Sequence, residues 1–354
     1  MAYPETFTTM RDLIEQKLQD TGNAVWTAAE LVFYITEGLR EISQFAPHIY
    51  MLEYLIESRR GTATSTTPGS LVDATNDQFV AGDVGKIVYN TKDRTWAYIT
   101  TYTDAETVVL SNDIMASGEG YRIFNKNCNH QKEIYIGDMA DWLWIDKIEF
   151  PVMNDPPDYP KWKERGKDVI RLDTDDEPDD TKDADAKKQV WIFFAMRHKL
   201  SQLTDFAGAT TAAYSAGVTT MNIGSLGTTD TIEMGQEFTI ADERSRGIYI
   251  VTENKTLASG AGDVKFWPPL ESSVATGKVI TFVSSTLTSK LEGIFADLVA
   301  GKAAMHKSRT FINKINVGPR AYEFMYNWGK LKYEEAKEEL ESLRGFEAPC
   351  IALP

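Results

Sequence analysis

The sequence has few of the side chains that build covalent or metal-held frameworks. Among its 354 residues there are only two cysteines, Cys128 and Cys350, and four histidines. Two cysteines cannot form a disulfide framework, and no spacing of cysteine and histidine matches a metal-binding motif. The pair Cys128 and His130 could supply at most two ligands. We therefore expect no metal site, and a reducing compartment for the chain.

Long apolar runs and phosphate-binding loops are also missing. No apolar run approaches the roughly 18 residues that a membrane-spanning helix needs, and the N-terminus lacks the basic and apolar segments of a signal peptide. The glycine-rich stretch 259–263 precedes no predicted helix, so we expect a hairpin turn there and not a phosphate site. These absences predict no membrane partner, no cofactor and no enzymatic activity.

Acidic residues outnumber basic ones and give a formal net charge of −15 at pH 7, which argues against a general nucleic-acid-binding protein. Residues 173–185 contain eight of the acids. An EF-hand is excluded there, because Pro178 stands where the loop requires glycine and Ala184 stands where it requires the final glutamate. We expect this segment to be a solvated loop.

Basic residues gather in one segment, 286–333, which has eight lysines or arginines and three acids. The members around its centre, which we call the basic band, are Lys302, Lys307, Arg309, Lys314 and Arg320. Two interpretations stay open from the sequence. The basic band is either an ordinary solvated face or a docking or lumen-facing surface in an assembly, where the opposite charge lies on a neighbour.

Two segments, 62–124 and 219–283, have the same order of sequence signals. Each has a glycine turn, a β-branched and aromatic strand, a second apolar strand and a closing strand that begins at glycine. Two copies are too few for a solenoid. We therefore expect two small all-β modules inserted into loops of one core, because loops tolerate insertions that a packed core does not.

In the first module, Trp96 and Tyr98 alternate with Ala97 and Ile99, so one strand face has two aromatic side chains. If this face were exposed, it could stack on sugar rings. Cross-strand packing within a small sandwich or barrel is the preferred interpretation. The second module has only Tyr249 on the face that we take as equivalent, which further weakens the sugar hypothesis.

Helical periodicity is strong near both ends of the chain. Apolar residues three and four apart predict helices over 6–20, 27–45, 287–314 and 320–344. The second of these begins with a capping box, in which Thr27 accepts a backbone hydrogen bond and Glu30 reaches back. Strands are predicted over 49–56, 132–136, 168–172 and 190–196.

We therefore predict an α+β fold: a helical framework, made of an N-terminal and a C-terminal helix pair, with two inserted small all-β modules. The expected divisions are the N-terminal part of the core (1–61), the first module (62–124), the middle of the core with the acidic loop (125–218), the second module (219–283), the C-terminal helix pair (284–345) and an apolar tail (346–354).

The stretch 13–31 resembles the opening of the head–tail adaptor, or connector, proteins of tailed bacteriophages. Those proteins typically have a short amphipathic helix, an Asp-Thr-x-Asn-x-x-Trp-Ser/Thr turn, and a capped helix ending in a Glu-x-x-Arg-Glu-like run. Here the turn covers 20–27 and the run covers 37–41. The Asp-Pro-Pro loop at 155–157 and the paired C-terminal helices are also similar to that group. The likeness covers the predicted framework and not the β-modules.

The resemblance implies a structural virion protein at the portal vertex, assembled in the host cytoplasm. Its copies would form a ring, commonly of about twelve, between the portal protein and a downstream neck or tail-completion protein. Genomic DNA would pass through the ring without sequence-specific binding, and an acidic wall suits this passage because it repels phosphate. The alternative is a glycan- or receptor-binding tail protein that uses the two β-modules.

The apolar tail is expected to be a docking segment. Its members Phe346, Pro349, Ile351 and Leu353 follow a predicted helix cap at Gly345, and so short a segment cannot bury them on itself. We expect the tail to dock on the portal or on a neighbouring subunit. The resemblance implies the same, because adaptors commonly grip the portal through their C-terminal region. Packing on the chain's own core is the alternative.

Overall fold

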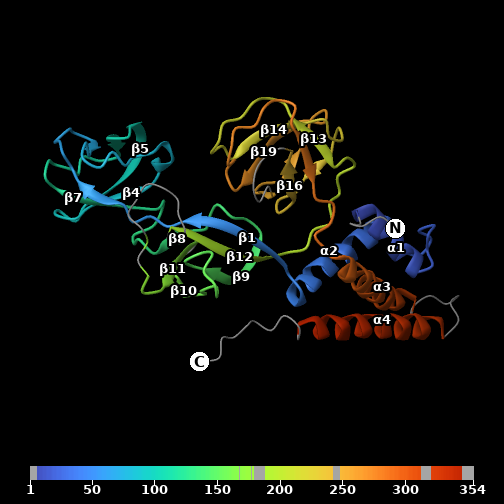
Figure 1. The fold of residues 1–354 in the computed structure, drawn as a ribbon. Coiled ribbons are helices and arrows are strands. Elements are labelled where there is room, and N and C mark those ends of the chain that lie inside the picture. The colour runs from blue at the N-terminus through green and yellow to red at the C-terminus, as the bar shows by residue number, and fades with distance from the viewer. Residues whose placement is uncertain are drawn as a thin grey trace. The chain divides into compact units, whose positions relative to one another are not determined.

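The computed structural model of the chain describes residues 6–166, 168–176, 178, 188–241, 248–311 and 320–344 (Figure 1). The protein is mostly β, with 24% of it helical and 32% in strands. The expected helical framework is therefore wrong. Helical spacing is a strong sequence signal, but it is confined here to segments near the two ends, and many of the strands between them are too short to leave a clear pattern.

The chain forms two compact units. Unit 1 comprises Met1–His48, Asp141–Leu143 and Ala195–Pro354, and unit 2 comprises Ile49–Ala140 and Trp144–Phe194. The α-helices of the described residues all belong to unit 1: α1 (Phe7–Lys17), α2 (Ala28–Phe45), α3 (Ser289–Phe311) and α4 (Ala321–Arg344). The four helices predicted from the sequence are thus present, but they support one unit only. No helix of the described part has both the length and the hydropathy to cross a membrane.

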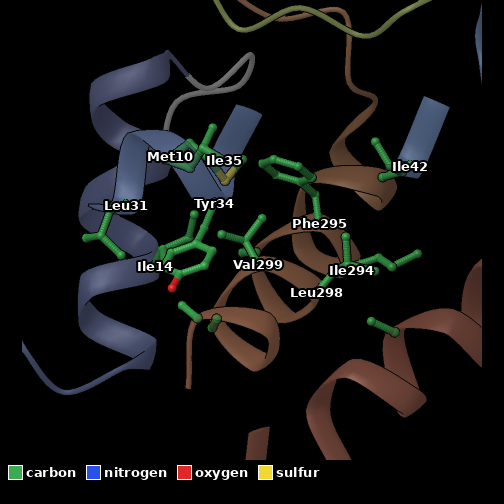
Figure 2. Close-up of a cluster of buried hydrophobic side chains, with 14 of the residues drawn as sticks. Met10, Ile14, Leu31, Tyr34, Ile35, Ile42, Ile294, Phe295, Leu298 and Val299 are labelled. Carbon is green, nitrogen blue, oxygen red and sulfur yellow. The ribbon is translucent and has the colours of Figure 1, made fainter. Parts of the chain in front are cut away.

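Helix α3 is the centre of the helical part of unit 1, where it contacts α1, α2 and α4. Apolar side chains of α1, α2 and α3 converge on one cluster (Figure 2). Its labelled members are Met10 and Ile14 from α1, Leu31, Tyr34, Ile35 and Ile42 from α2, and Ile294, Phe295, Leu298 and Val299 from α3. The apolar stripe of each amphipathic helix therefore faces the bundle interior.

Helices α3 and α4 cross at two glycines. A Cβ added to Gly329 would lie 2.7 Å from the carbonyl oxygen of Gly301, and one added to Gly301 would lie 2.7 Å from that of Gly329. Only residues without a side chain allow two backbones to come this close. The same face of α4 packs its apolar side chains on the cluster: Met325, Tyr333, Ala336, Leu340 and Leu343.

The second β-module, also in unit 1, is a closed barrel in which the strands pair in the order β13-β14-β19-β17-β16-β20. Its strands are β13 (Ala207–Thr210), β14 (Thr220–Gly224), β16 (Glu237–Ile240), β17 (Ile248–Val251), β19 (Gly262–Trp267) and β20 (Val279–Phe282), with the separate pair β15 (Thr231–Ile232) and β18 (Lys255–Thr256). The barrel begins at Ala207, upstream of the expected 219. Its core includes Phe238, Tyr249, Phe266 and Phe282, in contact with ring centroids between 5.3 and 5.6 Å apart.

The first β-module, in unit 2, is a six-stranded sheet in the order β2-β7-β4-β5-β6-β3. Its elements are β2 (Arg60–Thr62), β3 (Ser70–Val72), η1 (Ala81–Asp83, a 3-10 turn), β4 (Ile87–Asn90), β5 (Trp96–Asp104), β6 (Thr107–Leu110) and β7 (Gly120–Phe124). Strand for strand, this order matches β13-β20-β16-β17-β19-β14 of the barrel. The difference is closure: β13 pairs with β14, whereas β2 and β3 share no ladder. Hydrogen bonds between Thr64 and the segment 72–74 bridge that edge instead.

Two three-stranded sheets contain the remaining strands, most of whose residues belong to unit 2. One has the order β1-β12-β9 and the other β10-β11-β8. Their strands are β1 (His48–Leu55), β8 (Glu133–Tyr135), β9 (Trp142–Glu149), β10 (Lys161–Glu164), β11 (Val169–Asp173) and β12 (Gln189–Met196). The predicted strands 49–56, 132–136, 168–172 and 190–196 correspond to β1, β8, β11 and β12. The sequence analysis missed β9 and β10.

A buried ionic cluster lies where the chain enters the first module. The Arg59 side chain is 1% exposed and donates hydrogen bonds to Glu57 at 2.8 Å and to Asp83 at 3.0 Å. Lys86 contacts the same two carboxylates, at 2.6 and 2.9 Å. Lys188 approaches Glu57 at 3.8 Å. Two buried carboxylates thus share three cations, and this mutual pairing makes their burial tolerable.

Candidate functional site

The residues that carry the resemblance to adaptors form the corner between α1 and α2. The carboxylate of Asp20 accepts hydrogen bonds from the backbone N–H groups of Ala24, Val25 and Trp26, at 2.9, 2.9 and 2.8 Å. Burial alone would raise the pKa of Asp20, but these donors outweigh it and hold that pKa below its ordinary value. Asp20 therefore holds the loop between the two helices in one conformation.

The capping box predicted for α2 is confirmed. The Thr27 hydroxyl accepts from the N–H of Glu30 at 3.2 Å, and the Glu30 carboxylate accepts from the N–H of Thr27 at 2.8 Å. The same carboxylate pairs with Lys307 of α3 at 2.7 Å. The indole N–H of Trp26 donates to the carbonyl of Ala303, also on α3, at 3.3 Å. The adaptor-like corner is thus connected to α3 by one ion pair and one hydrogen bond.

We expect Asp20→Asn to destabilise unit 1 by about 1–3 kcal/mol at neutral pH, because the amide is a weaker acceptor for three N–H donors and brings a donor of its own. The folded-state pKa of Asp20 is depressed, so its contribution is complete above the unfolded value of 3.8 and is lost as the pH falls through the folded value. Denaturant unfolding of both proteins across this range measures the difference. If the difference in unfolding free energy between the two proteins stayed constant down to the folded-state pKa, the assigned role of Asp20 would be contradicted.

Two lysines of the basic band are paired within unit 1. Lys302 lies 3.2 Å from Glu41, and Lys307 lies 2.7 Å from Glu30; both carboxylates belong to α2. The hydroxyl of Tyr333, on α4, also donates to Glu41. These two lysines therefore form ion pairs between helices of the same chain. Neither interpretation from the sequence, a solvated face or a docking surface, included such pairs.

The other members of the basic band are divided between the surface and the undescribed part of the chain. Arg309 and Arg320 are exposed. Lys314 lies outside the described residues. The structure thus does not gather the basic band into a single free basic surface among the residues it describes, and its role in docking or in a lumen stays a prediction.

Helix α4 has a second apolar face, which the bundle does not cover. Phe324, Trp328 and Leu331 follow one another at spacings of four and three residues and are 71%, 36% and 53% exposed. We call these three residues the α4 stripe. A helix of a soluble bundle normally has one apolar face, directed to the core. Their spacing puts the three side chains on one side of α4, and that side is open to solvent.

A groove of about 320 Å³ lies beside the α4 stripe. It is lined by Leu18 and Trp26 of the adaptor-like corner, by Met325 of α4, and by Phe324 and Trp328 of the stripe itself. The stripe and the corner therefore form one surface. Helical periodicity over 320–344 predicted this helix but not its second apolar face, because apolar spacing alone does not show which side chains the bundle covers.

The cysteine and histidine side chains form no reactive arrangement among the described residues. No three potential metal ligands come together there. Burial raises the pKa of Cys128 to about 12, so its thiol is protonated at neutral pH. His130 is paired with a different residue: its Nε2 lies 3.2 Å from the guanidinium of Arg171. Burial lowers the pKa of His198 to about 4, which keeps this imidazole neutral.

The two aromatic side chains singled out in the first β-module lie on its outer face. Trp96 and Tyr98 are 41% and 53% exposed, whereas Ala97 and Ile99 are buried. The aromatic side chain of Trp96 does pack across strands, as the preferred interpretation held, but it does so on the outer face. Small and β-branched side chains fill the interior at this strand. The ring of Trp96 packs on that of Tyr89 on the outside, with 4.3 Å between centroids.

The predicted docking tail, with Phe346, Pro349, Ile351 and Leu353, lies outside the described residues. So does most of the acidic loop 173–185. Their roles stay predictions.

The chain was also compared with known proteins. No protein-family model matches it, and no curated protein matches its sequence.

Proposed function

We propose that the chain is a structural virion protein, a head–tail adaptor of a tailed bacteriophage. Its copies form a ring under the portal vertex that joins the capsid to the neck or tail and leaves a channel for DNA. Its partners are other copies of itself, the portal protein and a downstream neck or tail-completion protein. The α4 stripe carries this proposal, because it is an uncovered apolar surface that borders the adaptor-like corner.

A ring requires two different surfaces on each copy, one for each neighbour. The α4 stripe supplies the first. The helical part of unit 1 has another exposed aromatic side chain, Phe33 of α2, which is 57% exposed. We propose that the α4 stripe of one copy contacts the α2 surface around Phe33 of the next copy. Aromatic anchors of this kind contribute much of the binding energy at protein interfaces.

The charge of the chain suits a channel for DNA. A formal net charge of −15 gives the assembled ring a negative potential that disfavours adhesion of phosphates. The resemblance implies a ring of about twelve copies.

The assembly test uses the full chain with and without a portal protein, observed by mass photometry and negative-stain electron microscopy. We expect rings with the wild-type chain and only monomers with the double variant Phe324→Ser, Trp328→Ser, because the variant removes the aromatic anchors of the stripe. Circular dichroism verifies that the variant keeps its helices. A second variant, truncated after Gly345, separately tests the predicted docking tail.

The matched control is Trp144→Ser in unit 2, since Trp144 is 39% exposed, nearly the same fraction as Trp328. This control should assemble like the wild type. The proposal fails if the wild-type chain stays monomeric with the portal, or if the folded double variant still forms rings.

A further inference from the structure

The shared strand order of the two β-modules allows their paired positions to be compared directly. In the first module, one cross-strand row runs over β2, β7, β4 and β5 and consists of Arg60, Arg122, Tyr89 and Trp96. The corresponding row of the barrel, over β13, β20, β16 and β17, consists of Ala207, Thr281, Thr239 and Ile248. We call the first of these the arginine–aromatic row. The counterpart of Trp96 is thus Ile248, and not Tyr249 as the sequence alone suggested.

The arginine–aromatic row lies on the outer face of its sheet. Arg60, Arg122 and Trp96 are exposed, and Tyr89 is half-buried beneath the indole of Trp96. Tyr98 adds a second exposed aromatic ring on the same strand face, two residues along β5. The barrel maintains the same strand order with alanine, threonine and isoleucine at these positions. The fold therefore does not require the arginines or the aromatic rings.

We propose that the arginine–aromatic row, together with Tyr98, binds an acidic saccharide, meaning a sugar chain that carries carboxylate groups. Trp96 and Tyr98 present flat apolar surfaces on which the C–H faces of pyranose rings can pack. The planar guanidinium of Arg122 matches a carboxylate with two parallel donors. Four strands at their usual spacing extend about 14 Å, which is long enough for an oligosaccharide.

The charges around the row favour a sugar with separate carboxylates over a continuous polyanion. Arg122 forms no ion pair with any described residue, so its guanidinium can take a ligand carboxylate without breaking an existing pair. Between residues 60 and 124, however, acidic residues outnumber basic ones. A nucleic acid would meet this wider negative field, whereas a sugar carboxylate meets the guanidinium of Arg122 directly.

The test is a glycan array probed with the labelled full chain, followed by calorimetry with sialyllactose and lactose, a pair that differs in one carboxylate-bearing sugar, and with the best acidic glycan from the array. We expect binding to carboxylated glycans, with affinity falling as salt rises. Trp96→Ala and Arg122→Gln should each weaken binding at least about tenfold. Arg122 is exposed, so the thermal melt of Arg122→Gln should match the wild type. Trp96→Ala loses its contact with Tyr89, so its circular dichroism is used to verify that the variant is folded at the temperature of the binding experiment.

The internal control is Ile248→Ala, the same structural position in the second module, which should bind like the wild type. Three results would overturn the inference: no carboxylated glycan binds, neutral glycans bind equally well, or the two variants bind as the wild type does. Binding of a single-stranded oligothymidylate with loss in both variants would assign the row to nucleic acid instead. None of these results depends on ring assembly, so the inference stands or falls separately from the adaptor proposal.

Discussion

Arg59→Met is expected to destabilise unit 2 by about 3–5 kcal/mol. The substitution keeps much of the side-chain volume but leaves the buried carboxylates of Glu57 and Asp83 without their central partner. Lys86 and Lys188 remain nearby and compensate only in part. The cost arises because the folded state must still keep both charges away from water. Hydrogen exchange of peptides from 49–140 in increasing denaturant measures the change, since each unit can open independently.

The pH dependence of this effect has a definite sign. Burial alone would raise the pKa of Glu57 and of Asp83, but the hydrogen bonds and charge of Arg59, with the charge of Lys86, hold both pKa values below their ordinary values. Their contribution is therefore complete above the unfolded values of 4.5 and 3.8 and is lost as the pH falls through the folded values. Loss of Arg59 raises the folded-state pKa values of both carboxylates. The difference in unfolding free energy between variant and wild type should therefore narrow as the pH falls.

A neutral replacement of the cluster is the control. The triple variant Glu57→Gln, Arg59→Met, Asp83→Asn removes both carboxylates and their central cation, and leaves Lys86 and Lys188 in place. It should be less destabilised than Arg59→Met alone, because no unpaired carboxylate remains buried. If the triple variant were the less stable of the two, the unpaired charges could not be the cause of the loss.

Trp26→Ala is expected to destabilise unit 1 by about 3–5 kcal/mol. The indole is buried in the helical cluster, and its N–H donates to the carbonyl of Ala303. Its removal leaves a cavity between the adaptor-like corner and α3 and removes the hydrogen bond to the Ala303 carbonyl. All the described α-helices belong to unit 1, so the helical signal in circular dichroism follows this transition during denaturant unfolding.

The matched control for this prediction is Trp144→Ala, because Trp144 is 39% exposed and belongs to unit 2, which has no described α-helix. It should leave the helical transition within about 0.5 kcal/mol of the wild type. An equally small change for Trp26→Ala would mean that the corner does not depend on the tryptophan that the adaptor-like motif contains.

The sequence alone determined the local features of this protein. Thr27 and Glu30 are three residues apart, so their capping box is visible as a pattern, and the helical stripes at both ends of the chain are visible for the same reason. The order of signals in the two β-modules also indicated a repeat, and the strands of the two modules do pair in the same order.

Only the tertiary structure decided which faces are covered. Alternation along β5 separates Trp96 from Ala97 but does not state which of them lies inside, because a strand pattern with period two is symmetric. Likewise, Lys302 finds its carboxylate 261 residues away on α2, and no local pattern encodes that pairing. The prominence of the helical signals suggested a helical framework, whereas the strands that dominate the protein are short and become stable only through partners distant in the chain. Local hydrogen bonds can be inferred from the order of residues, while burial depends on contacts that exist only once the chain has folded.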